Sequence, residues 1–366
     1  VVLALLWPGD VPFINDEPQL ILNALIANGS GHLAPMGLQG TFGFAYGPFP
    51  TWVYQVMLGL THDLVVVSVL HILVMMLVTA AALWWLARTT GLWPGFVALP
   101  LLSPYFWFYA RVIWDNTFLL PLGALALAGY AAFLASRSTL GLRVALAAML
   151  CMPLVHLMSA SLLVPLGLHM LVLVVAGRSS TARGRGLWTL ASTVAVLAAL
   201  LAWMAWPYWL YLAGPHPPSP PHENVADGWL FPLYGGRLLG ARELDYFFGP
   251  EPLAGGPFAF TAAISLVAYG MSWFGMAIGV MTVGRAAATR QWTVPAHLAA
   301  IALGALAVQS LVHGMTARFE HPHYQSGTWI ATVFLAWLAV DWLVRRGRAW
   351  QVVGLAASGG LALANL

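Results

Sequence analysis

The 366-residue chain contains no lysine, a single cysteine and few charged residues. All 15 of its basic residues are arginine, so it holds no glycine-rich phosphate loop ending in a lysine, and an ATP-driven pump within this chain is excluded. The lone Cys151 can form neither an internal disulfide nor a thiolate metal site. Only 7% of the residues are charged, far below the usual share in a soluble domain.

Apolar residues take the place of the missing charges. They make up 60% of the chain, the mean hydropathy is +0.81, and apolar runs of about 20 residues recur from end to end. Long runs such as 64–86 do not alternate in polarity, which excludes a β-barrel. Because helices satisfy their own backbone hydrogen bonds in lipid, the sequence predicts an all-α polytopic membrane protein.

Charged residues alternate between arginine-rich and acid-rich connections, as the positive-inside rule expects. The arginine-rich connections are therefore predicted to be cytoplasmic, and every acid except Asp341 to lie outside. The net charge of +3 is explained by topology and indicates no nucleic-acid partner. About eleven transmembrane helices are expected, near residues 1–8, 64–87, 92–110, 117–136, 143–158, 161–177, 187–212, 258–283, 293–313, 327–344 and 350–366.

We expect residues 1–366 to form one transmembrane domain with a long first outer loop at 9–63. Two further outer loops are expected at 213–257 and 314–326. Both ends are expected to be truncated. The first seven residues are predicted to be the outer end of a trimmed helix, and the last apolar run stops without a polar tail.

The first outer loop is too long for a simple connection and is predicted to contain helices. Asn15 or Asp16 can cap a helix, Pro18 suits its first turn, and the pair at 28–29 ends it. A second short helix is expected after Gly47-Pro48. Both helices are predicted to lie along the membrane surface, which would hold Asp16 and Glu17 against the bilayer.

Four motifs follow one another between the expected helices. They are the acidic pair Asp16-Glu17, the helix start Gly47-Pro48, the phrase from Ser103-Pro104-Tyr105 to Arg111-Val112-Ile113-Trp114-Asp115-Asn116, and His321-Pro322-His323-Tyr324. In this order the chain resembles the GT-C glycosyltransferases. Within them it is similar to the branch of protein O-mannosyltransferases and lipid A aminoarabinose transferases, glycosyltransferase family 39. Some members carry a folded domain beyond the last helix, whereas this sequence is expected to end in lipid, so the resemblance implies no acceptor recognition by such a domain.

The resemblance implies an inverting glycosyltransferase that moves a sugar from a polyprenyl-phosphate carrier to an acceptor at the outer membrane face. Asp16 is the predicted general base, with Glu17 as the second candidate and Asp115 as a further catalytic residue. The predicted substrate-binding residues are Tyr46, Arg111, Arg318, His321, His323 and Tyr324. The two arginines would bind the carrier phosphate. No cofactor is expected, and a divalent cation is not indicated.

Structural explanations compete with each of these roles. Asp16 and Glu17 can cap a surface helix and complement its dipole, and Asp115 can cap the helix that it begins. Arg111 can make a cation–π contact with a neighbouring aromatic ring. An ion pair with Arg345 explains Asp341. Four histidines inside expected helices are predicted to have packing roles, namely His71, His156, His169 and His297.

Alternative functions are a transporter or flippase of lipid-linked sugars and an inactive GT-C-like subunit of a larger membrane complex. The sequence leaves open the sugar and whether the acceptor is a protein, a lipid or a glycan. The expected location is the cytoplasmic membrane of a prokaryote, with the lipid bilayer as a partner and the active site on the outer face.

Overall fold

The structure is a computed structural model, and it describes residues 13, 16–40, 45–176, 182–215, 235–236, 238–239, 258–316 and 322–364. Helices make up nearly all of the regular structure in these ranges, and one isolated bridge joins Gln39 and Ala45. The all-α prediction is therefore confirmed. The expected helix at 1–8 and most of the expected loop at 213–257 lie outside the described residues.

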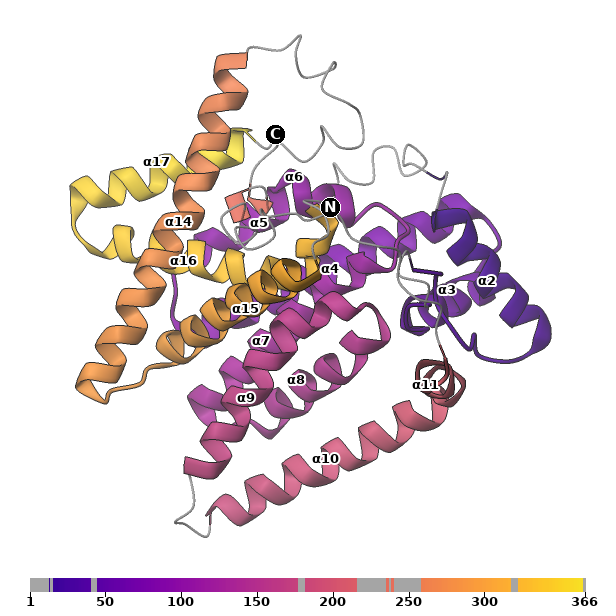
Figure 1. Cartoon of the computed structure of the whole chain (residues 1–366). Coiled ribbons are helices and arrows are strands. Elements are labelled where there is room, and N and C mark those ends of the chain that lie inside the picture. Colours follow the sequence, from indigo (N-terminus) through magenta and orange to yellow (C-terminus); the bar gives the residue numbers. More distant parts are fainter. Residues whose placement is uncertain are drawn as a thin grey trace.

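The described elements follow the expected order (Figure 1). They are α2 (Asp16–Ser30), α3 (Phe49–Leu60), α4 (Leu64–Thr90), η1 (Pro94–Val97), α5 (Ala98–Leu102), α6 (Pro104–Tyr109), η2 (Asn116–Phe118), α7 (Leu119–Ser136), α8 (Thr139–Cys151), η3 (Met152–Leu154), η4 (Leu157–Ser159), α9 (Ala160–Ala176), α10 (Ala182–Met204), α11 (Trp206–Ala213), α14 (Phe258–Thr289), α15 (Val294–Thr316), η7 (Pro322–Thr328), α16 (Trp329–Arg345) and α17 (Arg348–Ala364).

Several of these helices are long and apolar enough to cross a membrane. Within the described ranges there are five such spans, Leu64–Thr90, Asn116–Ser136, Leu266–Thr289, Val294–Gly314 and Gln325–Arg345. Val194–Met204 and Trp206–Ala213 meet at an angle of 78° and make a sixth if they are counted together. The chain is a membrane protein by these helices, and the expected number of about eleven spans is not confirmed.

The helix expected over 92–110 is broken into η1, α5 and α6, so this prediction was wrong as a single helix. Each piece has a proline in or before its first turn, at Pro94, Pro100 or Pro104. Proline lacks the backbone donor of a continuing helix and disfavours helical conformation at the preceding residue. Ser103 accordingly has an extended ψ of 130°.

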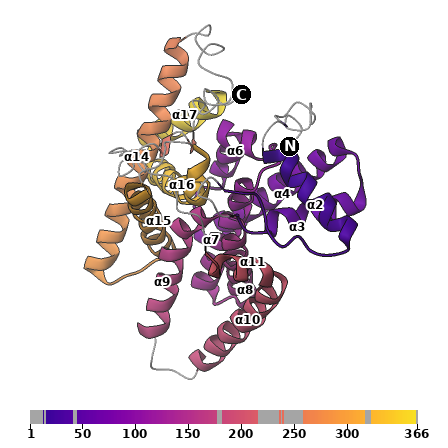
Figure 2. The same cartoon turned by 45° about the vertical axis from the view of Figure 1, so that its right-hand side comes forward.

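The helices pack into one bundle around α16 and α7. In the apolar stretch of the span that contains α16, 89% of the residues are buried, against 39% in that of α4. α16 is therefore central, and α4 presents a large apolar face outward. α7 packs against α4 and α8, and α16 against α14 and α15. Figures 1 and 2 show α2 and α3 on one side of the bundle and α14 and α17 on the other.

The contact between α7 and α8 depends on glycine. A Cβ atom at Gly129 would lie 2.5 Å from the carbonyl oxygen of Gly141 and 2.9 Å from the backbone nitrogen of Ala145. Two backbones can approach this closely only where no side chain separates them. Gly129 therefore sets the spacing of these two helices.

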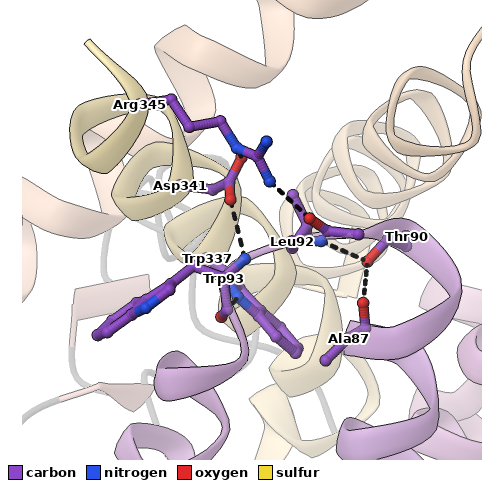
Figure 3. Close-up of polar contacts among 8 residues, drawn as sticks. Ala87, Thr90, Leu92, Trp93, Trp337, Asp341 and Arg345 are labelled. Carbon is purple, nitrogen blue, oxygen red and sulfur yellow. Dashed lines mark hydrogen bonds and ion pairs between the residues drawn. The ribbon is translucent and has the colours of Figure 1, made fainter. Parts of the chain in front are cut away.

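A polar cluster fastens the end of α16 to the connection after α4 (Figure 3). Asp341 accepts a hydrogen bond of 2.8 Å from the backbone nitrogen of Trp93 and pairs with Arg345 at 2.7 Å. Arg345 also donates to the carbonyl oxygen of Gly91, and Trp337 Nε1 donates to that of Trp93. The predicted ion pair between Asp341 and Arg345 is confirmed.

The segment before α4 holds α2 and α3, close to where the sequence predicts helices. Gln55 of α3 accepts from the backbone nitrogen of Ala34 and donates to the carbonyl oxygen of His32. Asn28 Nδ2 in turn donates to the carbonyl oxygen of Gln55, and Trp52 Nε1 donates to that of Ala34. The two helices thus form one packed unit, and their position along a membrane surface stays a prediction.

Candidate functional site

Asp16 is the first residue of α2, and its half-buried carboxylate is held by a tryptophan that is far away in the sequence. Trp114 Nε1 donates to Asp16 Oδ2 over 2.9 Å, a contact between residues 98 positions apart. The indole is in turn fixed by stacking on Tyr109, with ring centroids 6.1 Å apart. Burial raises the pKa of Asp16 above its usual 3.8, and the hydrogen bond from Trp114 opposes part of that rise.

Asp115 is almost fully buried, with 1% of its surface exposed. Its Oδ1 accepts from the backbone nitrogen of Asn116 over 2.7 Å, so the predicted capping role is present. Its Oδ2 has no hydrogen-bond partner within the described part of the chain. Burial, with a smaller contribution from the charge of Asp16, raises the pKa of Asp115 to about 8. The side chain is therefore largely protonated at neutral pH.

Tyr54 of α3 lies close to the carboxyl groups of Asp115 and Glu17. Its pKa is raised well above 10, first by complete burial and then by the negative charges of these two acids. Its hydroxyl forms a hydrogen bond of 2.9 Å with Nδ1 of the buried His71. Glu17 is itself buried. Acids from two parts of the sequence, Glu17 and Asp115, thus lie near one tyrosine.

An aromatic cluster holds Tyr54 and His71 in place. Phe118 of η2 makes edge contacts with both rings, at centroid distances of 5.7 and 5.6 Å. Phe49, at the start of α3, contacts the ring of Phe118, with ring centroids 6.1 Å apart. These contacts hold together α3, α4 and η2, the short helix that Asp115 caps.

The ring of Tyr46 contacts that of His156 in a tilted arrangement, with centroids 4.1 Å apart and an angle of 39° between the ring planes. The backbones also approach closely, because a Cβ atom at Gly47 would lie 2.2 Å from the carbonyl oxygen of Leu154. His156 was expected inside a helix. It instead has an extended conformation, φ −158° and ψ 148°, at the break between η3 and η4.

The segment that joins α15 to α16 reaches the same region. η7 packs beside η2 and η4, and a Cβ atom at Gly327 would lie 2.3 Å from the carbonyl oxygen of Met158. Of the predicted site residues here, His323 and Tyr324 lie in η7, although their side chains are not described. Arg318 and His321 lie outside the described residues.

Arg111 is buried at the end of α6 and contacts an aromatic ring. Its Cζ lies 4.4 Å from the ring centroid of Trp107, so the cation–π contact considered from the sequence is present. Phosphate binding by Arg111 stays a prediction.

The structure brings together Asp16, Glu17 and Asp115, and it places Tyr46 against His156. Sequence reasoning gave no functional role to Trp114, Tyr54 or His156. An aromatic residue or a lone histidine in an apolar segment carries no signal of the distant side chain that it meets. Within the described residues, no group of three or more His, Cys, Asp and Glu side chains is arranged to hold a metal ion.

The fold and this cluster define an α-helical membrane protein with three carboxyl groups gathered beside the N-terminal half of α4 and the start of α7. No family model, curated protein or solved structure matches the chain.

Proposed function

We propose that this protein is an inverting glycosyltransferase that moves a sugar from a polyprenyl-phosphate carrier to an acceptor. The reaction would take place at the outer face of a prokaryotic cytoplasmic membrane. The observation that carries this proposal is the position of Asp16, held by Trp114 beside the buried Asp115. A general base must be fixed within hydrogen-bond reach of the proton that it removes.

Asp16 suits the base better than its two neighbours. It is half-buried, whereas Glu17 and Asp115 are buried, so an acceptor hydroxyl can approach Asp16 more easily. Trp114 occupies Oδ2, and Oδ1 is the oxygen proposed to take the proton. The raised pKa of Asp16 makes it a stronger base than a carboxylate in water.

Asp115 supports this role by staying protonated. With a pKa of about 8 it adds no negative charge beside Asp16 at neutral pH. Asp16 is then the ionised member of the pair, in agreement with the rule that neighbouring carboxyl groups with separated pKa values divide acid and base roles.

In the proposed reaction, the acceptor hydroxyl gives its proton to Asp16 as its oxygen attacks the anomeric carbon. The bond from that carbon to the phosphate oxygen breaks, and the carrier phosphate leaves with the electron pair. Arg111 and Arg318 are proposed to stabilise the phosphate charge. Tyr46, His321, His323 and Tyr324 are proposed to contact the substrate.

One observation favours the alternative of a transporter for lipid-linked sugars. Tyr130, His169 and His297 form a hydrogen-bonded chain across α7, α9 and α15, with distances of 2.8 and 3.0 Å. Ionisable side chains bonded inside a membrane bundle are typical of proton relays in transporters.

Transfer measured in lipid separates the two functions. Purified protein would receive a pool of radiolabelled polyprenyl-phosphate sugars and candidate acceptors, and Asp16→Asn would be compared with the unchanged protein. We expect the substitution to lower transfer by about 100-fold or more, because it removes the base but preserves the size of the side chain.

The matched control is Asp63→Asn. Asp63 is an exposed carboxylate that caps α4 through the backbone nitrogen of Val65, and its substitution should leave transfer within about twofold. Full transfer by Asp16→Asn would refute its role as the base. Movement of the carrier across the bilayer without transfer, equal in all three proteins, would favour the transporter.

A further inference from the structure

We propose that His156 is a binding residue for the polyprenyl-phosphate sugar. Its Nε2–H would donate a hydrogen bond to an oxygen of this substrate, beside the ring of Tyr46. This inference rests on the proposed function and adds a residue for which the sequence predicts only a packing role.

The hydrogen bonds of His156 determine where its proton lies. Nδ1 accepts from the backbone nitrogen of Met158 over 3.1 Å, so Nδ1 carries no hydrogen. A ring nitrogen can accept a hydrogen bond only when the imidazole is neutral, so the ring of His156 is neutral. In a neutral imidazole one nitrogen is the donor and the other the acceptor. Nε2 is therefore the donor.

The Nε2–H group of His156 is buried, and none of the described residues accepts a hydrogen bond from it. His156 is 2% exposed, and Nε2 has no hydrogen-bond partner among the described residues. Leaving such a donor unbonded is unfavourable, so buried polar atoms without a protein partner require an explanation such as a ligand. A bound oxygen at Nε2 would satisfy it.

The surroundings of His156 favour the substrate as the source of that oxygen. Tyr46, at 4.1 Å between ring centroids, comes from the segment that precedes α3. η7, which contains His323 and Tyr324, packs against η4 directly after His156. One motif that predicts substrate binding thus contacts His156 through Tyr46, and the segment that contains another packs against η4, which begins at the next residue.

His169 differs from His156 in this respect. Both ring nitrogens of His169 are bonded within the protein, Nδ1 to Tyr130 and Nε2 to His297. His169 has a structural explanation that His156 lacks, and it provides a matched control.

The oxygen belongs either to the carrier phosphate or to a hydroxyl of the sugar, and both are acceptors for a neutral donor. The two sources are distinguished by comparing a C55 polyprenyl phosphate with a pool of the same carrier bearing hexoses and pentoses. Native mass spectrometry in detergent measures the occupancy of each bound species by its mass.

The informative variant is His156→Asn. Asparagine is a good N-cap residue and can keep a side-chain acceptor for the backbone nitrogen of Met158, but it does not reach the position of Nε2. We expect carrier occupancy to fall about tenfold, the usual effect of one lost hydrogen bond. His156→Gln, whose amide reaches further, should restore part of it, and His169→Asn should leave it within about twofold.

Loss confined to sugar-bearing carriers assigns the bond to the sugar, and equal loss for both probes assigns it to the phosphate. Unchanged occupancy in His156→Asn and His156→Gln, while the unchanged protein binds, overturns this inference and leaves the proposed function standing. If the unchanged protein binds neither probe, the proposed function itself fails. If His156→Asn does not fold, the carrier occupancy of His156→Gln is compared with that of His169→Asn. A purely structural role of His156 predicts equal occupancy in these two variants, whereas a binding role predicts a lower value for His156→Gln.

Discussion

At the scale of single residues, burial rather than sequence neighbourhood sets the chemistry of the acidic cluster. Asp16 and Asp115 are both aspartates near a helix start, yet one is half-buried and bonded to an indole while the other is almost fully enclosed. Desolvation disfavours the charged form of both, and more so that of Asp115. The two carboxyl groups are thus able to hold different protonation states at one pH.

This difference predicts how stability depends on pH. The pKa of Asp115 is about 8 in the folded protein, against about 3.9 in an unfolded chain. Its contribution to stability is therefore complete below about pH 4 and is lost as the pH rises through about 8. Asp115→Asn should remove this loss, so that its stability relative to the unchanged protein improves by at least about 1 kcal/mol between pH 5 and pH 9.

Thermal melting in detergent at the two pH values measures this effect. Asp63→Asn is the control, because Asp63 is exposed and its substitution should leave the pH dependence unchanged. A pH dependence of Asp115→Asn equal to that of the unchanged protein would show that Asp115 is ionised in the fold.

The bond from Trp114 predicts a shift in the pH profile of transfer. Trp114→Phe keeps a ring to stack on Tyr109 but removes the N–H that stabilises ionised Asp16. The pKa of Asp16 should then rise, and because a base acts when deprotonated, the acidic limb of the rate should move up by about one pH unit. Trp84→Phe, in an exposed tryptophan of α4, should not move it. A downward shift in Trp114→Phe would contradict the assigned bond.

At the scale of elements, the bundle depends on close backbone contacts and on polar links between helices. α7 and α8 meet at Gly129, and α16 is fastened to the connection after α4 by Asp341. Tyr130 joins α7 to α9 through His169. Such contacts matter in lipid, where apolar packing alone does not favour one helix partner over another.

Gly129 allows a direct test of this packing. In Gly129→Ala the added methyl group would meet backbone atoms at 2.5 and 2.9 Å, which cannot move aside as a flexible side chain could. We expect a loss of about 1 to 3 kcal/mol in stability, the usual effect of overpacking. Gly167→Ala in α9 is the control, because nothing lies within 4 Å of the added atom. Equal melting temperatures for the two variants would show that α7 and α8 are not in contact at Gly129.

At the scale of the whole molecule, the arrangement of the termini of the helices predicts two chemically different faces. The acidic cluster lies beside the N-terminal half of α4 and the start of α7, while Arg345 and Arg346 lie at the end of α16. The positive-inside rule predicts that the arginines face the cytoplasm.

Cysteine labelling tests this orientation, with Cys151→Ala as the background. We expect His62→Cys to react with a membrane-impermeant maleimide from outside intact cells and Arg348→Cys only after the membrane is opened. Both positions are exposed, so labelling reports the side of the membrane rather than burial. Reversed labelling would place the acidic cluster in the cytoplasm and contradict the proposed reaction at the outer face.

The sequence by itself determined the features that depend on local physics. Apolar runs predict the membrane helices, Asn28-Gly29 lies where α2 ends, and the spacing of Asp341 and Arg345 predicts their ion pair. Polarity, capping and contacts four residues apart act within one helix, so they can be inferred without knowing what the helix meets. The prolines after α4 are local features too, but the sequence analysis did not predict that together they divide the helix expected over 92–110 into three pieces.

Only the tertiary structure decided which side chains form the site. It brought Trp114 to Asp16 across 98 positions, enclosed Asp115 and placed His156 against Tyr46. Burial and contact between distant segments depend on how helices pack, and a residue's own neighbours in sequence do not contain that information. The protonation of Asp115 and the buried donor of His156 both follow from this packing, because desolvation acts on the folded chain alone.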